Sequence, residues 1–129
     1  MGTSKLPKPT EAELSILRVL WERGPTTVRE VWEELSPEQH TGYTTVLKLL
    51  QIMCDKGLVA RDESGRSHVY RAAVSQDKTQ RQAVRHLLDR LFAGSAPKLV
   101  MQALAAKKAT PEELAEIRRL LDEMERGNS

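Results

Sequence analysis

Residues 41–73 read TGYTTVLKLLQIMCDKGLVARDESGRSHVYRAA, and the character of this stretch changes twice. Apolar residues first recur at intervals of three and four, which indicates an amphipathic helix that ends at Gly57. Apolar and polar residues then alternate, stop alternating at residues 63–66, and alternate again up to Tyr70, which is typical of a β hairpin. The stretch therefore predicts one helix followed directly by one small hairpin.

Two further helices are predicted ahead of this stretch. Each opens with a capping box, in which a threonine oxygen accepts from the third helical amide and a glutamate reaches back to the cap. The two threonine and glutamate pairs are Thr10 with Glu13 and Thr27 with Glu30. A Gly-Pro pair at residues 24–25 should end the first helix, and a Ser-Pro pair at residues 36–37 should end the second. Three helices followed by a two-stranded hairpin form the element order of a winged helix, a variant of the helix-turn-helix.

The composition narrows the class of protein. The chain has 129 residues, of which 40% are hydrophobic, but it has only one Phe, two Tyr and two Trp. This aliphatic balance favours a mainly α protein built on Leu, Val and Ala. A lone cysteine, Cys54, excludes an intramolecular disulfide and a cysteine metal cluster. Because no apolar run has the length of a membrane helix and no signal peptide is recognisable, we expect a cytoplasmic protein.

The third predicted helix has a polar face suited to DNA. The major groove admits one helix, and short hydroxyls, amides and cationic side chains read the base edges there. Side chains of these kinds lie at the start of the helix and at the hairpin tip, where they can reach bases, phosphates or the neighbouring minor groove. The predicted DNA-binding residues are Tyr43, Thr44, Thr45, Lys48, Gln51, Arg66, Ser67 and His68.

Charge supports this interpretation only locally. The net charge is +2, but residues 40–71 hold five Lys and Arg against three acidic residues, whereas residues 1–39 hold five against seven. A locally basic segment beside an acidic one is consistent with a nucleic-acid surface and also with an ordinary solvated helix face. A winged helix that binds a protein rather than DNA remains an alternative. So does a variant with a small ligand between the winged helix and the tail.

The same residues carry a family resemblance that spans roughly residues 10–125. The motifs are the first helix ending in Leu20-Trp21, TVREV at residues 27–31, YTTV at residues 43–46 and KGLV at residues 56–59. Together they resemble the penicillinase-repressor (BlaI/MecI-type) family of transcriptional regulators. The resemblance implies a winged-helix homodimer that represses transcription by binding an inverted-repeat, double-stranded DNA operator.

The rest of the chain predicts a dimerisation region. Helices are expected at residues 77–92 and 98–106 and from a threonine cap at Thr110 onward, each with an apolar stripe. Short helices with exposed stripes have little to pack against, so a second copy would cover them, unless they fold back on the winged helix of their own chain. The predicted dimerisation residues are Leu87, Leu91, Leu99, Leu104, Leu114, Ile117 and Leu121. We therefore divide the chain into a winged-helix DNA-binding domain, residues 1–75, and a helical dimerisation region, residues 76–129.

The resemblance also implies an inducing signal. Members of the family are typically inactivated by proteolysis in the C-terminal region, downstream of a membrane-bound metalloprotease that senses β-lactam, which would connect the protein to antibiotic resistance. The matching position is Gln102-Ala103, where the best-known members have Asn-Phe, and a plain helical segment is the alternative. A copper-sensing branch of the family has a C-terminal cysteine cluster, which residues 124–129 lack.

No enzyme signature is recognisable. The sequence lacks a glycine-rich phosphate loop, a nucleophile elbow and paired catalytic carboxylates. His40, His68 and His86 lack metal-ligand spacing, so we expect neither a metal site nor a cofactor. Trp21, Trp32 and Cys54 are expected to pack in or beside the core.

Overall fold

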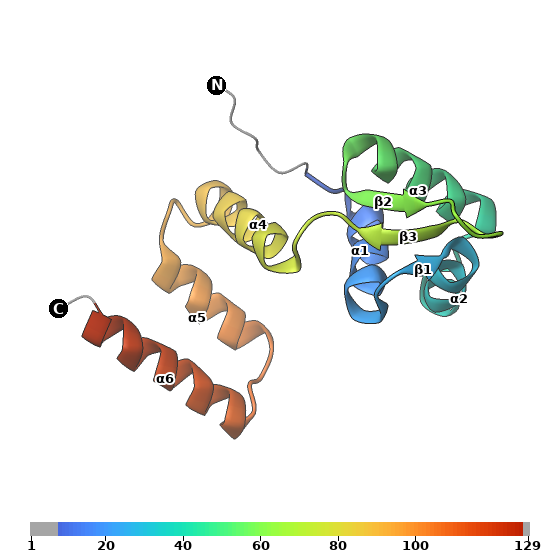
Figure 1. The fold of residues 1–129 in the computed structure, drawn as a ribbon. Coiled ribbons are helices and arrows are strands. Elements are labelled where there is room, and N and C mark those ends of the chain that lie inside the picture. The colour runs from blue at the N-terminus through green and yellow to red at the C-terminus, as the bar shows by residue number, and fades with distance from the viewer. Residues whose placement is uncertain (1–7, 128–129) are drawn as a thin grey trace. The chain divides into compact units, whose positions relative to one another are not determined.

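The computed structural model describes residues 8–127 and is mainly helical. Figure 1 shows the order of its elements. They are α1 (Glu11–Arg23), β1 (Thr26–Thr27), α2 (Val28–Gln39), α3 (Tyr43–Lys56), β2 (Val59–Asp62), β3 (Val69–Ala72), α4 (Gln76–Leu91), α5 (Ala96–Ala106) and α6 (Pro111–Gly127). The chain divides into two compact units between Ala83 and Val84, within α4. The first unit has the predicted winged-helix order, which confirms the predicted fold class.

One hydrophobic core holds the three helices of the first unit to its sheet. Both predicted capping boxes are formed, at Thr10 for α1 and at Thr27 for α2, so local sequence sets where these helices begin. The fully buried side chains come from every layer of the unit. They include Ile16, Leu17, Val31, Val46, Leu50, Met53, Leu58 and Tyr70. Burying each large side chain contributes roughly 1.5–3 kcal/mol, so this cluster fixes the position of α3.

The sheet has three strands rather than the two that the sequence predicts. The two-residue strand β1 pairs with β3 through Thr26 opposite Tyr70 and Thr27 opposite Val69, and the strand order is β1-β3-β2. β2 and β3 pair from Val59 opposite Ala72 to Asp62 opposite Val69, so the loop between them spans residues 63–68. A strand of two residues shows no alternation, which is why the sequence does not predict β1.

Helix α2 continues past the predicted stop at residues 36–37. Pro37 lies inside the helix, which ends at Gln39. A proline removes a single backbone donor, and the next donors can still complete the turn: the amide of His40 donates to the carbonyl of Ser36 at 3.0 Å. His40 then takes a left-handed conformation with φ of 51°, which ends the helix. Pro37 therefore lies in the last turn of α2 and does not mark the end of the helix.

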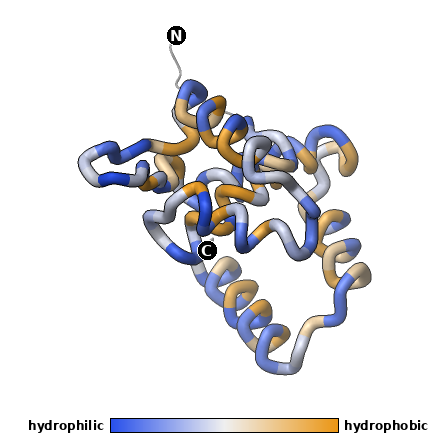
Figure 2. Tube along the Cα trace, turned by 90° about the vertical axis from the view of Figure 1, so that its right-hand side faces the viewer, coloured by the Kyte–Doolittle hydropathy of each residue, from blue (hydrophilic) through white to orange (hydrophobic). Residues whose placement is uncertain are grey.

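The second unit contains the C-terminal part of α4 together with α5 and α6. Hydrophobic and hydrophilic positions alternate along its helices at the helical period (Figure 2). Neither α5 nor α6 buries a side chain completely. Large apolar side chains remain exposed instead; they are Val84, Leu87, Leu91, Val100, Met101, Leu104, Leu120, Leu121 and Met124. Within residues 8–127, no helix is long and apolar enough to cross a membrane.

Candidate nucleic-acid interface

Helix α3 separates its buried and polar residues cleanly. Val46, Leu50 and Met53 lie on the face that packs into the core and are fully buried. The five polar residues predicted to bind DNA are all exposed on this helix: Tyr43, Thr44, Thr45, Lys48 and Gln51. Since four of them fall within the first two turns, the N-terminal half of α3 presents hydroxyl and ammonium groups side by side, and the amide of Gln51 follows on the next turn. This is the half of a recognition helix that usually meets base edges.

The hairpin loop provides a second polar surface. Arg66, Ser67 and His68 lie in this loop and are exposed. The amide of Ser64 donates to Asp62 Oδ1 at 2.9 Å and lowers the pKa of the Asp62 carboxyl. At the base of the loop, the Arg61 guanidinium makes hydrogen bonds to Tyr70 and to Glu63. Both raise the pKa of Arg61, and the bond to Tyr70 has the larger effect. The strands are thus held by polar contacts, while the loop residues extend into solvent.

An ion pair between the buried Glu13 of α1 and the partly exposed Lys56 of α3 is a feature that sequence reasoning missed. Lys56 Nζ lies 2.7 Å from Glu13 Oε1, although the two residues are 43 positions apart. Burial alone would raise the pKa of the Glu13 carboxyl, but the hydrogen bonds from Lys56 and from the Thr10 amide outweigh it and lower that pKa. The pair fastens the C-terminal end of α3 to the N-terminal end of α1. The only sequence signal was the glutamate of the capping box.

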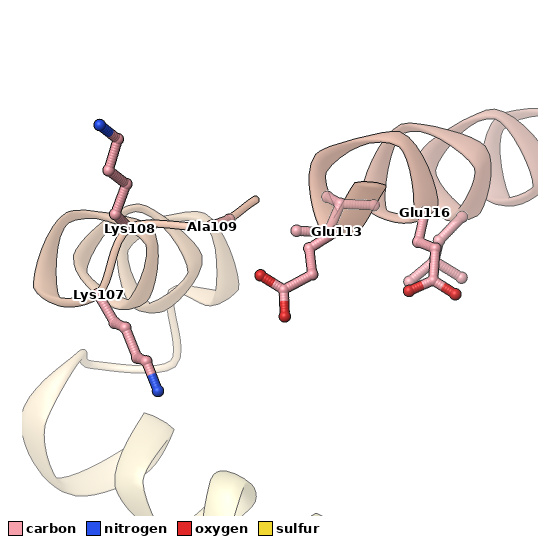
Figure 3. Close-up of a pocket in the computed structure, with 7 residues that line it drawn as sticks. Lys107, Lys108, Ala109, Glu113 and Glu116 are labelled. Carbon is pink, nitrogen blue, oxygen red and sulfur yellow. The ribbon is translucent and has the colours of Figure 1, made fainter. Parts of the chain in front are cut away.

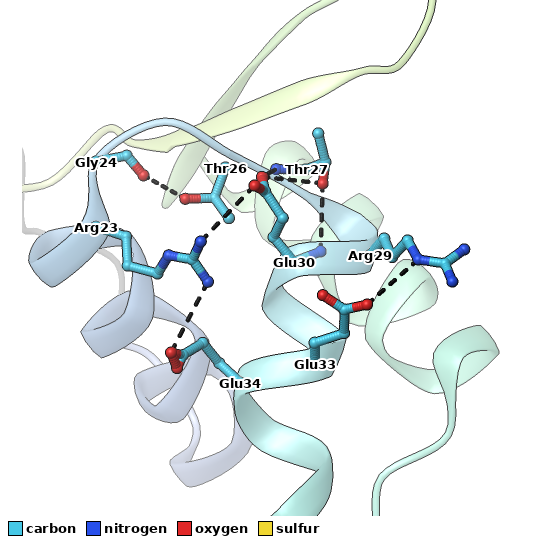
Figure 4. Close-up of polar contacts among 8 residues, drawn as sticks. All are labelled: Arg23, Gly24, Thr26, Thr27, Arg29, Glu30, Glu33 and Glu34. Carbon is cyan, nitrogen blue, oxygen red and sulfur yellow. Dashed lines mark hydrogen bonds and ion pairs between the residues drawn. The ribbon is translucent and has the colours of Figure 1, made fainter.

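Polar contacts also join α1 to α2 beside the interface (Figure 4). Arg23 approaches Glu30 at 3.7 Å and Glu34 at 3.8 Å. The backbone amide and the hydroxyl of Thr27 donate hydrogen bonds to the Glu30 carboxylate. Both lower the pKa of Glu30, and the amide has the larger effect. Arg29 pairs with Glu33 on the exposed side of α2. Three of the acidic residues of α2, Glu30, Glu33 and Glu34, are therefore paired with arginines within the first unit.

Two tryptophans hold backbone carbonyls of the first unit. Trp21 Nε1 donates to the carbonyl of Val74, and Trp32 Nε1 donates to the carbonyl of Thr41, each at 3.0 Å. Both rings are partly buried and pack against the core, as the sequence predicts. The carbonyl partners were not predictable from sequence, because each depends on how the helices pack.

In the second unit, the predicted cleavage position lies within a helix. Gln102 and Ala103 are exposed and lie inside α5. Of the predicted dimerisation residues, Leu87, Leu91, Leu104 and Leu121 are exposed. Leu99, Leu114 and Ile117 are partly buried. The unit therefore has apolar side chains on α4, α5 and α6 that its own packing does not cover.

An open depression of about 480 Å³ lies where α5 connects to α6 (Figure 3). Its lining residues are Lys107, Lys108, Ala109, Glu113, Glu116, Ile117 and Leu120. Ile117 and Leu120 belong to the apolar side of α6, so the depression continues the uncovered surface. In the part of the chain described here, no group of three or more His, Cys, Asp or Glu could hold a metal ion.

Known proteins are similar to this chain over most of its length. A family model described as "Penicillinase repressor" matches residues 9–123. The penicillinase repressor of Bacillus licheniformis is 25% identical over 119 residues, covering 92% of this chain and 93% of that protein. The transcriptional regulator BlaI of Mycobacterium tuberculosis is 36% identical over 76 residues, covering 58% of this chain and 55% of the regulator.

Two solved structures are similar to part of the chain. The solution structure of the DNA-binding domain of the repressor BlaI is 26% identical, with a TM-score of 0.52, and covers 59% of this chain and 93% of its own. The solution structure of the monomeric form of Bacillus licheniformis BlaI in complex with the blaP half-operator is 27% identical, with a TM-score of 0.51. It covers 57% of this chain and 90% of its own. Together with the family match over residues 9–123, they establish that this winged-helix protein belongs to the penicillinase repressor family.

Proposed function

We propose that this transcriptional repressor of the penicillinase repressor family binds DNA sequence-specifically as a homodimer on an inverted-repeat operator. The observation that carries the proposal is the exposed polar face of α3, where Thr44, Thr45, Lys48 and Gln51 stand opposite the buried stripe. The hairpin loop with Arg66, Ser67 and His68 would contact the backbone beside that helix. The complex of the BlaI relative with a half-operator supports DNA as the partner.

The homodimer is supported by the second unit. Leu87, Leu91, Leu104 and Leu121 are exposed there, together with other large apolar side chains of α4, α5 and α6. Burying them against a second copy would remove this apolar surface from water. A two-fold dimer presents two recognition helices to half-sites about 34 Å apart or a multiple of that distance, so the operator would be near-palindromic.

A selection of bound sequences from random duplex DNA at moderate salt tests the proposal. Recovery of a spaced inverted repeat is the expected result. Recovery of single, unspaced half-sites would contradict the homodimer but keep sequence-specific binding. Recovery of nothing, even at low salt where phosphate contacts are strongest, would contradict DNA binding and favour a protein-interaction module instead.

Relief of repression by proteolysis stays a prediction of the family resemblance. Cleavage at Gln102 or Ala103 would require α5 to open, because both residues lie inside that helix. The expected readout is a fragment ending at one of these residues, seen by mass spectrometry after the protein meets a membrane-bound sensor metalloprotease. An intact chain under inducing conditions would count against this signal.

A further inference from the structure

Trp32 of α2 touches the start of α3 in two ways. Its indole Nε1 donates to the carbonyl of Thr41 at 3.0 Å, in the turn between the helices. Its ring meets the ring of Tyr43 edge-on, with centroids 6.0 Å apart and planes at 77°. Edge-to-face pairs of this geometry are attractive beyond the area that they bury. One side chain therefore contacts both the turn and the first residue of α3.

The turn itself has few other contacts; the amide of His40 donates to the carbonyl of Ser36 at 3.0 Å and closes the last turn of α2. Its first residue, His40, has a φ of 51°. Its last residue, Gly42, is the N-cap of α3 and supplies no side-chain cap. The hydroxyl of Thr41 reaches the carbonyl of Gln39 only at 3.5 Å. By contrast, α1 and α2 both begin with a complete capping box. The N-terminal end of α3 thus takes its position from a tertiary contact rather than from a local cap.

We propose that Trp32 is a positioning residue for DNA recognition, whose indole N–H and ring edge fix the turn and Tyr43 so that the first turns of α3 meet base edges in one orientation. This inference rests on the proposed function, since it concerns the same helix face. Base readout requires side chains held to within about half an ångström, whereas attraction to phosphates tolerates larger displacements. The effect of Trp32 should therefore appear in sequence discrimination.

The chain offers a matched control in Trp21. Both indoles donate at 3.0 Å to a backbone carbonyl, and both rings are partly buried against the same core. Trp21, however, holds Val74, after the last strand, and has no contact with the turn before α3 among the interactions described. Trp21→Phe and Trp32→Phe remove the same kind of hydrogen bond while keeping an aromatic ring. Loss of stability alone should affect them alike.

The experiment measures the affinity of full-length protein for its selected operator and for random duplex DNA, together with the melting temperature. We expect Trp32→Phe to weaken operator binding about three- to ten-fold, the range set by one lost hydrogen bond, with random-sequence binding changed by less than about two-fold. Trp21→Phe should lower the melting temperature comparably and leave the ratio of operator to random affinity unchanged.

Two results would overturn the inference. They are an unchanged affinity ratio in Trp32→Phe, which includes a parallel fall of both affinities, and an equal fall of that ratio in Trp21→Phe. If Trp32→Phe does not fold, a site-specific benzothiophene analogue at position 32 keeps the shape of the indole and removes only the N–H, and the same comparison applies. A wild-type protein that prefers no sequence would instead contradict the proposed function, a failure visible before any variant is made.

Discussion

At the scale of single residues, the exposed side chains of α3 and the loop divide by the kind of DNA contact that they suit. Lys48 and Thr45 are exposed on α3, where the proposed function would bring them to base edges, and Arg66 is exposed in the loop, where it would meet phosphates. Contacts to bases carry sequence preference, and contacts to phosphates carry salt dependence. The two roles can therefore be separated by experiment.

Lys48→Ala or Thr45→Ala should weaken binding to the selected operator by about 1–3 kcal/mol, because a lost base contact removes discrimination at one position. Competition between the operator and its single-base variants measures this loss. Arg18, which is exposed on α1, provides the control substitution Arg18→Ala. If the preference at every operator position survives in the variants, the assignment of these side chains to bases is wrong.

Arg66→Ala should weaken binding to all sequences and reduce the slope of log affinity against log salt by about one unit, as expected for one lost phosphate contact. Titrations at several salt concentrations, on operator and on random DNA, give both slopes. A loss confined to the operator, with the slope unchanged, would indicate a base contact in place of a phosphate contact.

Sequence predicted the exposure of these residues well, because the period of α3 alone places them opposite the buried stripe. It missed the contacts of Glu13 and Trp32. Each of these depends on a partner far along the chain or on another helix. Periodicity describes one element at a time, so it does not contain that information.

At the scale of elements, the ion pair of Glu13 with Lys56 connects the stability of the winged helix to pH. Because its pKa is lowered, the Glu13 carboxyl stays ionised to a lower pH in the folded protein than in the unfolded chain. The resulting stabilisation is complete above the ordinary glutamate pKa of about 4.3 and is lost as the pH falls through the lower, folded value.

Glu13→Gln should therefore destabilise the protein at pH 7 by about 1–3 kcal/mol, because it weakens a charge-assisted hydrogen bond to Lys56 at a buried position. The difference from wild type should shrink as the pH falls through the folded pKa of Glu13. Urea unfolding followed by circular dichroism between pH 3 and pH 7 measures it. Glu30→Gln alters the capping box of α2, where the glutamate is more exposed, and should cost less. A difference that is constant across this range would contradict the linkage.

Elements also show where local signals stop being sufficient. Capping boxes identified the starts of α1 and α2, since the cap and its partner lie three residues apart. The extent of α2 beyond Pro37 and the pairing of β1 did not follow from local signals. The first depends on whether the turn after a proline still closes, and the second on a strand more than forty residues away.

At the scale of the whole molecule, the exposed leucines predict self-association. Leu91 is 72% exposed and Leu121 is 55% exposed, so a charged substitution at either position costs the single chain little. Leu91→Glu or Leu121→Glu should convert a two-chain mass to a one-chain mass, because the charge would have to be buried at the interface. Sedimentation equilibrium measures this mass. Arg119→Glu, on the other side of α6 by helical spacing, is the control.

The operator affinity of these variants should fall along with their mass. Once one subunit of a dimer is bound, the other is held near the second half-site at a high effective concentration. The affinity of the dimer for the operator is therefore higher, although no new contact forms. Gel-shift titrations over a range of protein concentrations would show this loss. Wild-type protein that sediments as one chain would contradict the homodimer. It would favour the alternative in which the tail packs on its own winged helix.

Thr27 ends β1 and also caps α2. The strand that pairs with β3 and the helix that precedes the recognition turn therefore share one residue, and no linker separates them. A displacement of β3 would therefore also displace Thr27 and the start of α2, because no flexible segment lies between them. Residues 63–68 lie outside the paired strands, so strand pairing does not constrain this part of the wing. If the first unit binds DNA as proposed, we expect adjustment to different phosphate positions to be concentrated in residues 63–68 rather than in the paired strands.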